Sequence, residues 1–307
     1  MPFSHHSHCG QFCLHAKDSL EEVIQTAIAK GMKTFALTEH MPRDLEDLYP
    51  EEIEHYRDAQ ALAAVFDNYY QEAQRLRLKY GDQIHLPIGF ESEWIRPSSL
   101  DLIKNLQTKF KFDLFVGSVH HVHTIPIDFD RPMYEQARRK AGGSDEQLFK
   151  DYFDAQEEML HALRPPVVGH FDLIRLLSDD PNGSFRPMPE VWERILRNLD
   201  FIASYGGLLE INSAAVRKGM REPYPQIEIC QEFVSRGGGF VLSDDSHGVE
   251  QVATNYARVL PSIEAAGITR LFALQKVGTT QCDALKADFE FVPIDMEEVK
   301  RMSFWTS

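Results

Sequence analysis

Histidines and carboxylates recur along this 307-residue chain at the ends of short apolar segments. A lone histidine on a strand usually serves packing, but a series at the ends of successive segments is difficult to attribute to packing alone. Imidazole nitrogens and carboxylate oxygens are protein ligands for Zn²⁺, Mn²⁺ and Fe²⁺. The sequence therefore predicts a site for divalent transition metals. The residues in this series are His6, His8, His40, Glu91, His120, His170, Asp245 and His247.

The N-terminal stretch MPFSHHSHCGQFCLH contains the densest group of these side chains. Successive residues of a strand point to opposite faces, so His6 and His8 lie on one face and can bind the same ion. His5 and Cys9 then point to the other face, where we expect them to have packing roles.

An alternation of strand-like and helix-like segments must position these side chains. The first unit pairs PFSHHSH with DSLEEVIQTAIAKG, in which Asp18 or Ser19 caps a helix and Gly31 ends it. Further helices are expected at about 51–80, after Ser98 and at 145–163. The strand-like runs that follow the first are TFALTEH, IHLPIGFE, DLFVGSVHH, PVVGHFDLI, GLLEINS, GFVLSDDSH and RLFALQ.

Seven or eight such units predict an α/β fold with a closed parallel barrel, and a doubly wound open sheet is the competing arrangement. In α/β barrels the C-terminal ends of the strands form the functional face. We therefore expect the metal-binding side chains to converge at that rim. Residues 122–143, rich in charge and proline, are expected to form a long loop. No Pro-, Gly- or Ser-rich linker divides the sequence, and we expect a single domain over residues 1–307.

Composition excludes several functional classes. The net charge of −15 would repel a phosphate backbone, which disfavours a nucleic-acid partner. No run of about 18 apolar residues occurs, and the N-terminus lacks a basic region followed by an apolar stretch, so neither a membrane span nor a signal peptide is expected. The four scattered cysteines, Cys9, Cys13, Cys230 and Cys282, do not resemble a disulfide framework. We expect a cytoplasmic protein.

The spacing of the motifs resembles a known family over most of the chain. The relevant motifs are HSH at 6–8, His15, TEH ending at His40, GFE ending at Glu91, GSVH ending at His120, GHFD containing His170, and DSH with Asp245 and His247. This set is similar to the polymerase and histidinol phosphatase (PHP) family. TEHMPR, GHFDLIR, EINSAAVRKG, EPYP and the chain length further resemble its histidinol-phosphate phosphatases of the fungal type.

The resemblance implies a distorted TIM-like (β/α)7 barrel with three metals, Zn, Mn or Fe, at the C-terminal rim of its strands. It assigns His6, His8, Glu91 and Asp245 to one ion. It assigns Glu91, His120 and His170 to a second ion, and His15, His40 and His247 to a third. The sequence SVHHVH leaves the register open among His120, His121 and His123, and we favour His120 because it directly follows GSV.

The resemblance also implies hydrolysis of the small-molecule phosphate monoester L-histidinol phosphate to L-histidinol and phosphate, a step of histidine biosynthesis. Glu91, Asp245, Arg175 and Arg217 are the expected catalytic residues. Arg175 and Arg217 follow strand ends and could bind phosphate through their guanidinium groups, as could Arg43. Glu222 could meet the ammonium group of the substrate. Asp172 is a second candidate for the ammonium, and the candidates for the ring are His123, Phe12 and Tyr224. The oligomeric state is not indicated.

Other functions compete with this one. A phosphoesterase of the same family could act on a nucleotide or sugar phosphate with the same metal ligands. A non-catalytic PHP accessory module of DNA polymerase machinery is disfavoured by the complete ligand set and by the net charge. An amidohydrolase is disfavoured because no lysine has a clear metal-bridging position.

Overall fold

The computed structural model describes residues 3–277 and 288–302. Seven of its strands pair in parallel, two in one sheet and five in another. β1 pairs with β2, and the remaining five pair in the order β3-β4-β7-β8-β9. The strands are β1 (Phe3–Ser4), β2 (Thr34–Phe35), β3 (Glu91–Glu93), β4 (Val116–Ser118), β7 (Val167–Val168), β8 (Leu208–Asn212) and β9 (Gly239–Ser243).

Isolated bridges connect the two groups of strands. Leu37–Ile88 and His40–Glu91 are parallel bridges from the segment after β2, the first to the segment that leads into β3 and the second to the first residue of β3. A third parallel bridge, Ser7–Ser246, connects the segments that follow β1 and β9. The seven strands thus follow one another in a closed order, which confirms the predicted α/β fold and favours the barrel over the open sheet.

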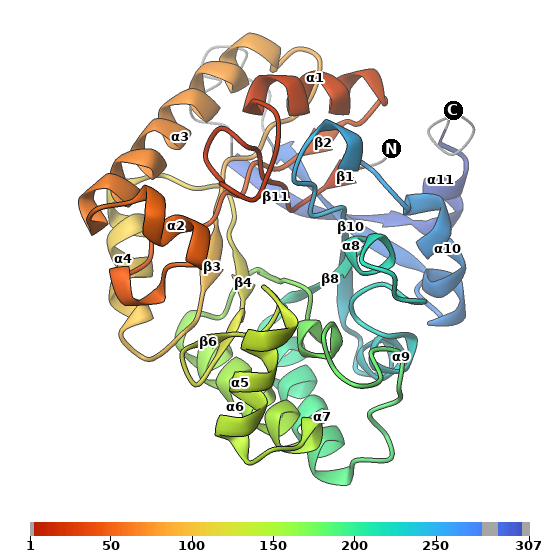
Figure 1. Ribbon diagram of the computed structural model, residues 1–307. Coiled ribbons are helices and arrows are strands. Elements are labelled where there is room, and N and C mark those ends of the chain that lie inside the picture. Colours follow the sequence, from red (N-terminus) through yellow and green to blue (C-terminus); the bar gives the residue numbers. More distant parts are fainter. Residues whose placement is uncertain (1–2, 278–287, 303–307) are drawn as a thin grey trace.

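Helices alternate with these strands and surround them (Figure 1). α1 (Leu20–Ala29) begins as predicted, because Ser19 accepts a hydrogen bond from the backbone of Glu22 while the Glu22 side chain accepts one from the backbone of Ser19. Its buried face carries Leu20, Val23, Ile24 and Ala27, which anchor it to the core. The larger helices that follow include α3 (Ala59–Tyr80), α4 (Ser99–Lys109), α6 (Asp145–Leu163), α7 (Pro189–Tyr205), α9 (Ile227–Ser235) and α10 (Tyr256–Ala265). The short helices include α8 (Ala214–Arg217) and α11 (Met296–Lys300).

The last strand-like run of the sequence forms a hairpin. β10 (Arg270–Val277) pairs antiparallel with β11 (Asp288–Asp295) and supplies no eighth parallel strand among the described residues. Phe272 and Phe291 pack against the residues Val116, Val167, Leu208 and Val241 near the first residues of four ring strands. The hairpin therefore closes the N-terminal end of the ring, and the opposite end remains for a functional site.

Two predicted segments differ in the structure. Residues 122–143 are not one long loop, because they contain the end of β5 (His121–Val122), β6 (Ile125–Pro126) and α5 (Arg131–Ala141). Asp130 caps α5 by accepting a hydrogen bond from the backbone of Met133. The helix expected at 51–80 is divided into α2 (Pro50–His55) and α3, because Tyr56 has an extended backbone and Asp58 caps a new helix start.

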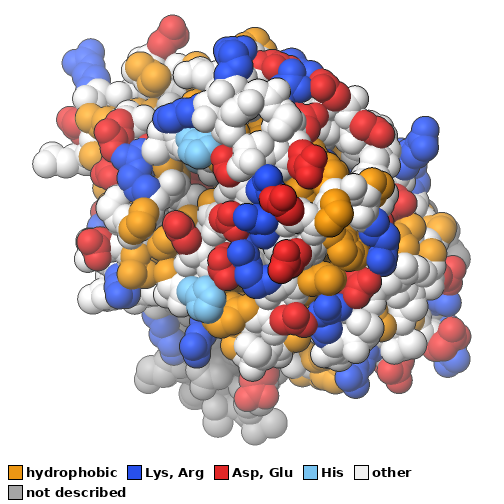
Figure 2. All heavy atoms as spheres, turned by 90° about the horizontal axis from the view of Figure 1, so that it is seen from below, with side chains coloured by type: hydrophobic (Ala, Val, Ile, Leu, Met, Phe, Trp, Pro, Cys, Tyr) orange, Lys and Arg blue, Asp and Glu red, His pale blue; other side chains and the backbone are white. Residues whose placement is uncertain are grey.

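Surface charge is distributed without a basic patch on the face drawn in Figure 2, where acidic and basic side chains are interspersed. Helix α5 illustrates the pattern, because its Arg131 and Arg138 both form ion pairs with Glu135 and Asp179. Within the described part of the chain, no helix combines the length and the apolar composition that a membrane crossing requires. Cys282 lies outside the described residues.

Candidate metal centre

The carboxylate of Glu91, 1% exposed, lies at the centre of the histidine cluster. Its Oε1 is 2.9 Å from His170 Nε2 and 3.3 Å from both His120 Nε2 and His6 Nε2. Its Oε2 is 2.9 Å from His40 Nδ1 and 3.5 Å from His8 Nε2. One buried carboxylate thus contacts histidines from five positions along the chain.

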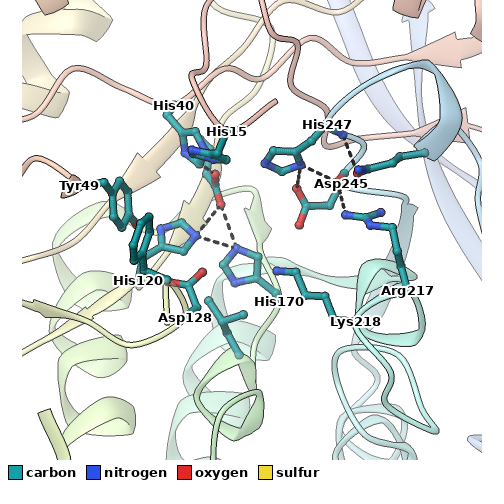
Figure 3. A pocket seen from close by; sticks show the side chains of 14 residues that line it. His15, His40, Tyr49, His120, Asp128, His170, Arg217, Lys218, Asp245 and His247 are labelled. Carbon is teal, nitrogen blue, oxygen red and sulfur yellow. Dashed lines mark hydrogen bonds and ion pairs between the residues drawn. The ribbon is translucent and has the colours of Figure 1, made fainter. Parts of the chain in front are cut away.

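Two further groups of ligand atoms flank this carboxylate. His6, His8 and Asp245 form one, with Asp245 Oδ1 lying 3.8 Å from His6 Nε2 and 3.5 Å from His8 Nε2. His15, His40 and His247 form the other, next to the His8 ring, which stacks on His40 with ring centroids 4.2 Å apart. The structure therefore brings together all nine residues that the sequence predicts as metal ligands. Figure 3 shows those that line the adjoining cavity, among them His15, His40 and His120.

The donor set fits divalent metals. Buried ring nitrogens without a hydrogen-bond partner are costly, because desolvation of a polar group is then uncompensated. His6 Nε2, His8 Nε2 and His40 Nε2 are buried and have no hydrogen-bond partner among the described residues. A metal ion bound to these nitrogens would remove the penalty.

In the metal-free site, the histidines that contact Glu91 and those around His15 differ in their protonation states. Burial lowers the pKa of His8 and His120, but their contacts with Asp245, Glu39 and Glu91 outweigh it and raise each pKa to about 9. On the other side, burial and the charge of His8 lower the pKa of His15 to about 4. Positive charge therefore collects beside Glu91 when no metal is present.

Glu210 supports the cluster from beneath and was not singled out in the sequence. Its Oε1 lies 2.9 Å from His6 Nδ1, and its Oε2 accepts a hydrogen bond from the backbone of His170. This contact leaves His6 Nε2 directed toward Glu91 and Asp245. A carboxylate that binds the second nitrogen of a metal-binding histidine fixes its ring and raises its basicity. The signal in the sequence was a carboxylate inside the apolar run GLLEINS.

A cavity of about 350 Å³ opens above the cluster. Two cations reach it from the segment after β8, because Arg217 ends α8 and Lys218 follows it. Arg217 donates hydrogen bonds to the carbonyl oxygens of Asp244 and Asp245, which hold its guanidinium beside the metal ligands (Figure 3). The lining residues include His15, His40, Tyr49, Glu91, His120, Asp128, Phe129, His170, Arg217, Lys218, Asp245 and His247.

Three predicted substrate contacts need correction. Arg175 is 1% exposed, lies outside the cavity lining, and donates to Asp172 as well as to the carbonyl oxygens of Pro181 and Pro223. The hydrogen bonds of its guanidinium therefore go to other parts of the protein and not to a substrate. Arg43 is likewise buried, and its guanidinium pairs with Glu93 and Glu52.

Glu222, the third of these residues, is also used internally, because its carboxylate accepts a hydrogen bond from the backbone of Ile227. The alternative carboxylate, Asp172, is fully buried against Arg175. His123 lies on the surface and pairs with Asp151, whereas His120 lies in the cluster, next to Glu91 and His170. Tyr224 and Phe12 also lie outside the cavity lining.

The cavity wall opposite Arg217 and Lys218 is built by residues that the sequence did not indicate (Figure 3). The rings of Tyr49 and Phe129 stack with centroids 5.6 Å apart. Asp128, next to Phe129, has a buried Oδ1 without a hydrogen-bond partner in the described chain. The cavity therefore has cations at one end and an aromatic pair with a carboxylate at the other.

Comparisons of the sequence and of the fold relate this chain to known proteins. The model of the PHP domain matches residues 4–214. A Schizosaccharomyces pombe protein named as a probable histidinol-phosphatase is 49% identical over 278 residues, which span 90% of each chain. The histidinol-phosphatase of Saccharomyces cerevisiae is 35% identical over 83% of this chain and 86% of its own length. A histidinol phosphate phosphatase from Lactococcus lactis, solved with zinc, L-histidinol and phosphate, has a TM-score of 0.65 at 20% identity and covers 88% of this chain and 95% of its own.

A parallel α/β ring with histidines and carboxylates at its C-terminal rim defines the class of protein. The chain belongs to the PHP family.

Replacing Glu91 by Gln should remove most of the bound metal, because one carboxylate contacts the ligands on both sides. Glu210→Gln should have a smaller effect, weakening metal affinity by roughly 10- to 100-fold, as is usual for partners of metal-binding histidines. Elemental analysis after dialysis, followed by chelator titration, measures both effects. Glu72→Gln on the outer surface of α3 is the matched control and should retain wild-type metal content. Wild-type metal content in Glu91→Gln would contradict the central role of this carboxylate.

Metal binding near pH 7 should release protons. His8 and His120 have pKa values of about 9 in the metal-free site, so both are protonated at pH 7 and must lose a proton to coordinate an ion. The release should decline as the pH rises through 9, because the free histidines are then already neutral. Calorimetry in buffers of different ionisation enthalpy counts the protons. Metal uptake at pH 7 without net proton release would show that these histidines are neutral before binding.

Proposed function

We propose that this chain hydrolyses L-histidinol phosphate to L-histidinol and phosphate, a step of histidine biosynthesis. The observation that carries the proposal is the nine-donor cluster around Glu91 at the base of a cavity that presents Arg217 and Lys218. Relatives named as histidinol-phosphatases, at 49% and 35% identity over most of the chain, support the choice of substrate.

Different residues of the chain bind the metals and the phosphate in the proposed reaction. Divalent metals, when bound, lower the pKa of water and stabilise the oxygens of a phosphoryl group during displacement. Glu91 and Asp245 act by holding these ions in place. The Arg217 guanidinium and the Lys218 ammonium bind the phosphate oxygens and offset their charge. In the hydrolysis, the bond between phosphorus and the histidinol oxygen breaks, a new bond to a water oxygen forms, and the released alcohol takes up a proton.

The opposite end of the cavity suits the rest of the substrate. Histidinol phosphate carries a primary ammonium and an imidazole ring. Asp128 supplies an unpaired buried acceptor for a cationic donor, and the Tyr49–Phe129 pair offers an aromatic surface for the ring. These residues take the roles first expected of Glu222, Asp172, Tyr224, Phe12 and His123.

The ligand groups support three ions per chain, with zinc, manganese and iron as the candidates. One group is centred on His6, His8 and Asp245, a second on His120 and His170, and a third on His15, His40 and His247. Glu91 would be shared by the first two. The free thiols of Cys9, Cys13 and Cys230 are consistent with the cytoplasmic location that we propose.

A phosphate-release assay on a panel of monoesters tests the proposed substrate. Histidinol phosphate should be hydrolysed with kcat/KM at least about a hundredfold above p-nitrophenyl phosphate or a nucleoside monophosphate, because buried polar groups penalise analogues that lack their partners. Preference for a nucleotide or sugar phosphate would favour a different phosphoesterase activity on the same metal centre. As an independent check, the gene should restore growth without histidine to a cell that lacks this phosphatase.

Two cavity variants should separate the two ends of the substrate. Arg217→Ala should lower kcat/KM for every phosphate monoester tested, by a few kcal/mol in transition-state terms, because a charge-assisted contact to phosphate is lost. Asp128→Asn should raise KM for histidinol phosphate and leave p-nitrophenyl phosphate hydrolysis nearly unchanged. Metal content should stay at the wild-type level in both variants. Equal losses on both substrates for Asp128→Asn would exclude its role at the ammonium or ring.

A further inference from the structure

The thiol of Cys13 lies next to the third group of histidines. Its Sγ is 3.1 Å from His15 Nε2, and the residue is 6% exposed. One ligand atom from each of Cys13, His15, His40 and His247 lies within 4.8 Å of all the others. The Cys13 side chain therefore occupies the position of a fourth donor beside three imidazoles.

The backbone holds this thiol in place. Cys13 donates its backbone N–H to the carbonyl oxygen of Cys9, and its own carbonyl oxygen accepts from Ala16, so residues 13–16 form a tight turn. The turn places the Cys13 and His15 side chains together. Lys17 donates its backbone N–H to the carbonyl oxygen of His247, which ties the loop to the segment that supplies another ligand.

The spacing fits coordination of one ion. With Zn–S near 2.3 Å and Zn–N near 2.05 Å, a sulfur and a nitrogen on the same zinc lie roughly 3.1 to 3.6 Å apart for angles between 90° and tetrahedral. The distance between Cys13 Sγ and His15 Nε2 is within this range. His40 Nδ1 faces Glu91, whereas its Nε2 is buried and has no hydrogen-bond partner in the described chain.

We propose that Cys13 is the fourth protein ligand of the ion held by His15, His40 and His247, and that it makes this position selective for zinc. Four protein ligands form a closed site, whereas three leave a position open for water or substrate. A thiolate also supplies a negative charge that three neutral imidazoles lack, and soft sulfur favours Zn²⁺ over Mn²⁺. The inference rests on the proposed metal loading and adds a fourth protein ligand to the third of its ions.

Cobalt substitution tests the proposal without substrate. The Co²⁺-loaded wild-type protein should show a near-ultraviolet thiolate-to-cobalt charge-transfer band, and Cys13→Ser should lose it while remaining folded by circular dichroism. Cys9→Ser is the matched control, because Cys9 is buried in the same loop but lies outside the four-donor group, and it should keep the band. A band that is absent from wild type, or that persists in Cys13→Ser, would overturn the assignment.

X-ray absorption spectroscopy of the zinc-loaded wild-type protein tests the same ligand without any variant, so it remains informative if the variants misfold. One sulfur scatterer at about 2.3 Å is expected. Dialysis against excess Mn²⁺ should leave one zinc per chain in wild type and remove it from Cys13→Ser. A zinc spectrum without sulfur, or complete exchange in wild type, would reject the proposal. A protein that shows the sulfur ligand but does not hydrolyse histidinol phosphate would reject only the proposed function.

Discussion

Burial of the Glu91 carboxylate among histidines is the interaction on which the rest of the structure depends. Burial alone would raise its pKa, but the charges of His6, His120 and His40 outweigh that effect and hold the pKa well below its usual range. A buried negative charge is stable only when cations surround it, whether imidazolium groups or metal ions. These partners lie in the segments that follow β1, β2 and β4, so the carboxylate can be buried only when these strands come together.

A polar network beneath the cluster keeps the strand ends in register. Ser4 donates a hydrogen bond to Asp244, which joins β1 to the end of β9. Asn212 at the end of β8 donates to Glu210 and lies 3.3 Å from Asp245. Asp245 itself has a left-handed backbone with φ of 48°, an unfavourable conformation for a residue other than glycine. Such strain persists where surrounding contacts fix the residue, and here it directs a carboxylate into the cluster.

The clustering of these histidines and carboxylates was predictable from the sequence, because side chains at the ends of parallel strands meet whatever the conformation of the loops. His40, Glu91 and His170 each follow an apolar run, and in a parallel ring such positions meet at one rim. The direction of a side chain in an irregular segment has no comparable rule, so Arg175 was placed in the cavity although it is bound internally. Asp128 and Tyr49 could not be predicted as cavity residues, because their loops come together at the cavity only in the folded protein.

The two sides of the cluster differ chemically, and this difference bears on how metals enter. Around Glu91, carboxylates keep His8 and His120 protonated, so an arriving ion must displace protons. Around His15, burial and the nearby charge of His8 favour neutral imidazoles, which can accept an ion directly. A divalent ion bound to His8 would replace the charge of its proton by a larger positive charge, and the carboxylates of Glu91 and Asp245 would have to offset that charge before a second cation could bind next to it. The shared position of His8 between the two sides therefore couples their occupation, even though they use largely separate donors.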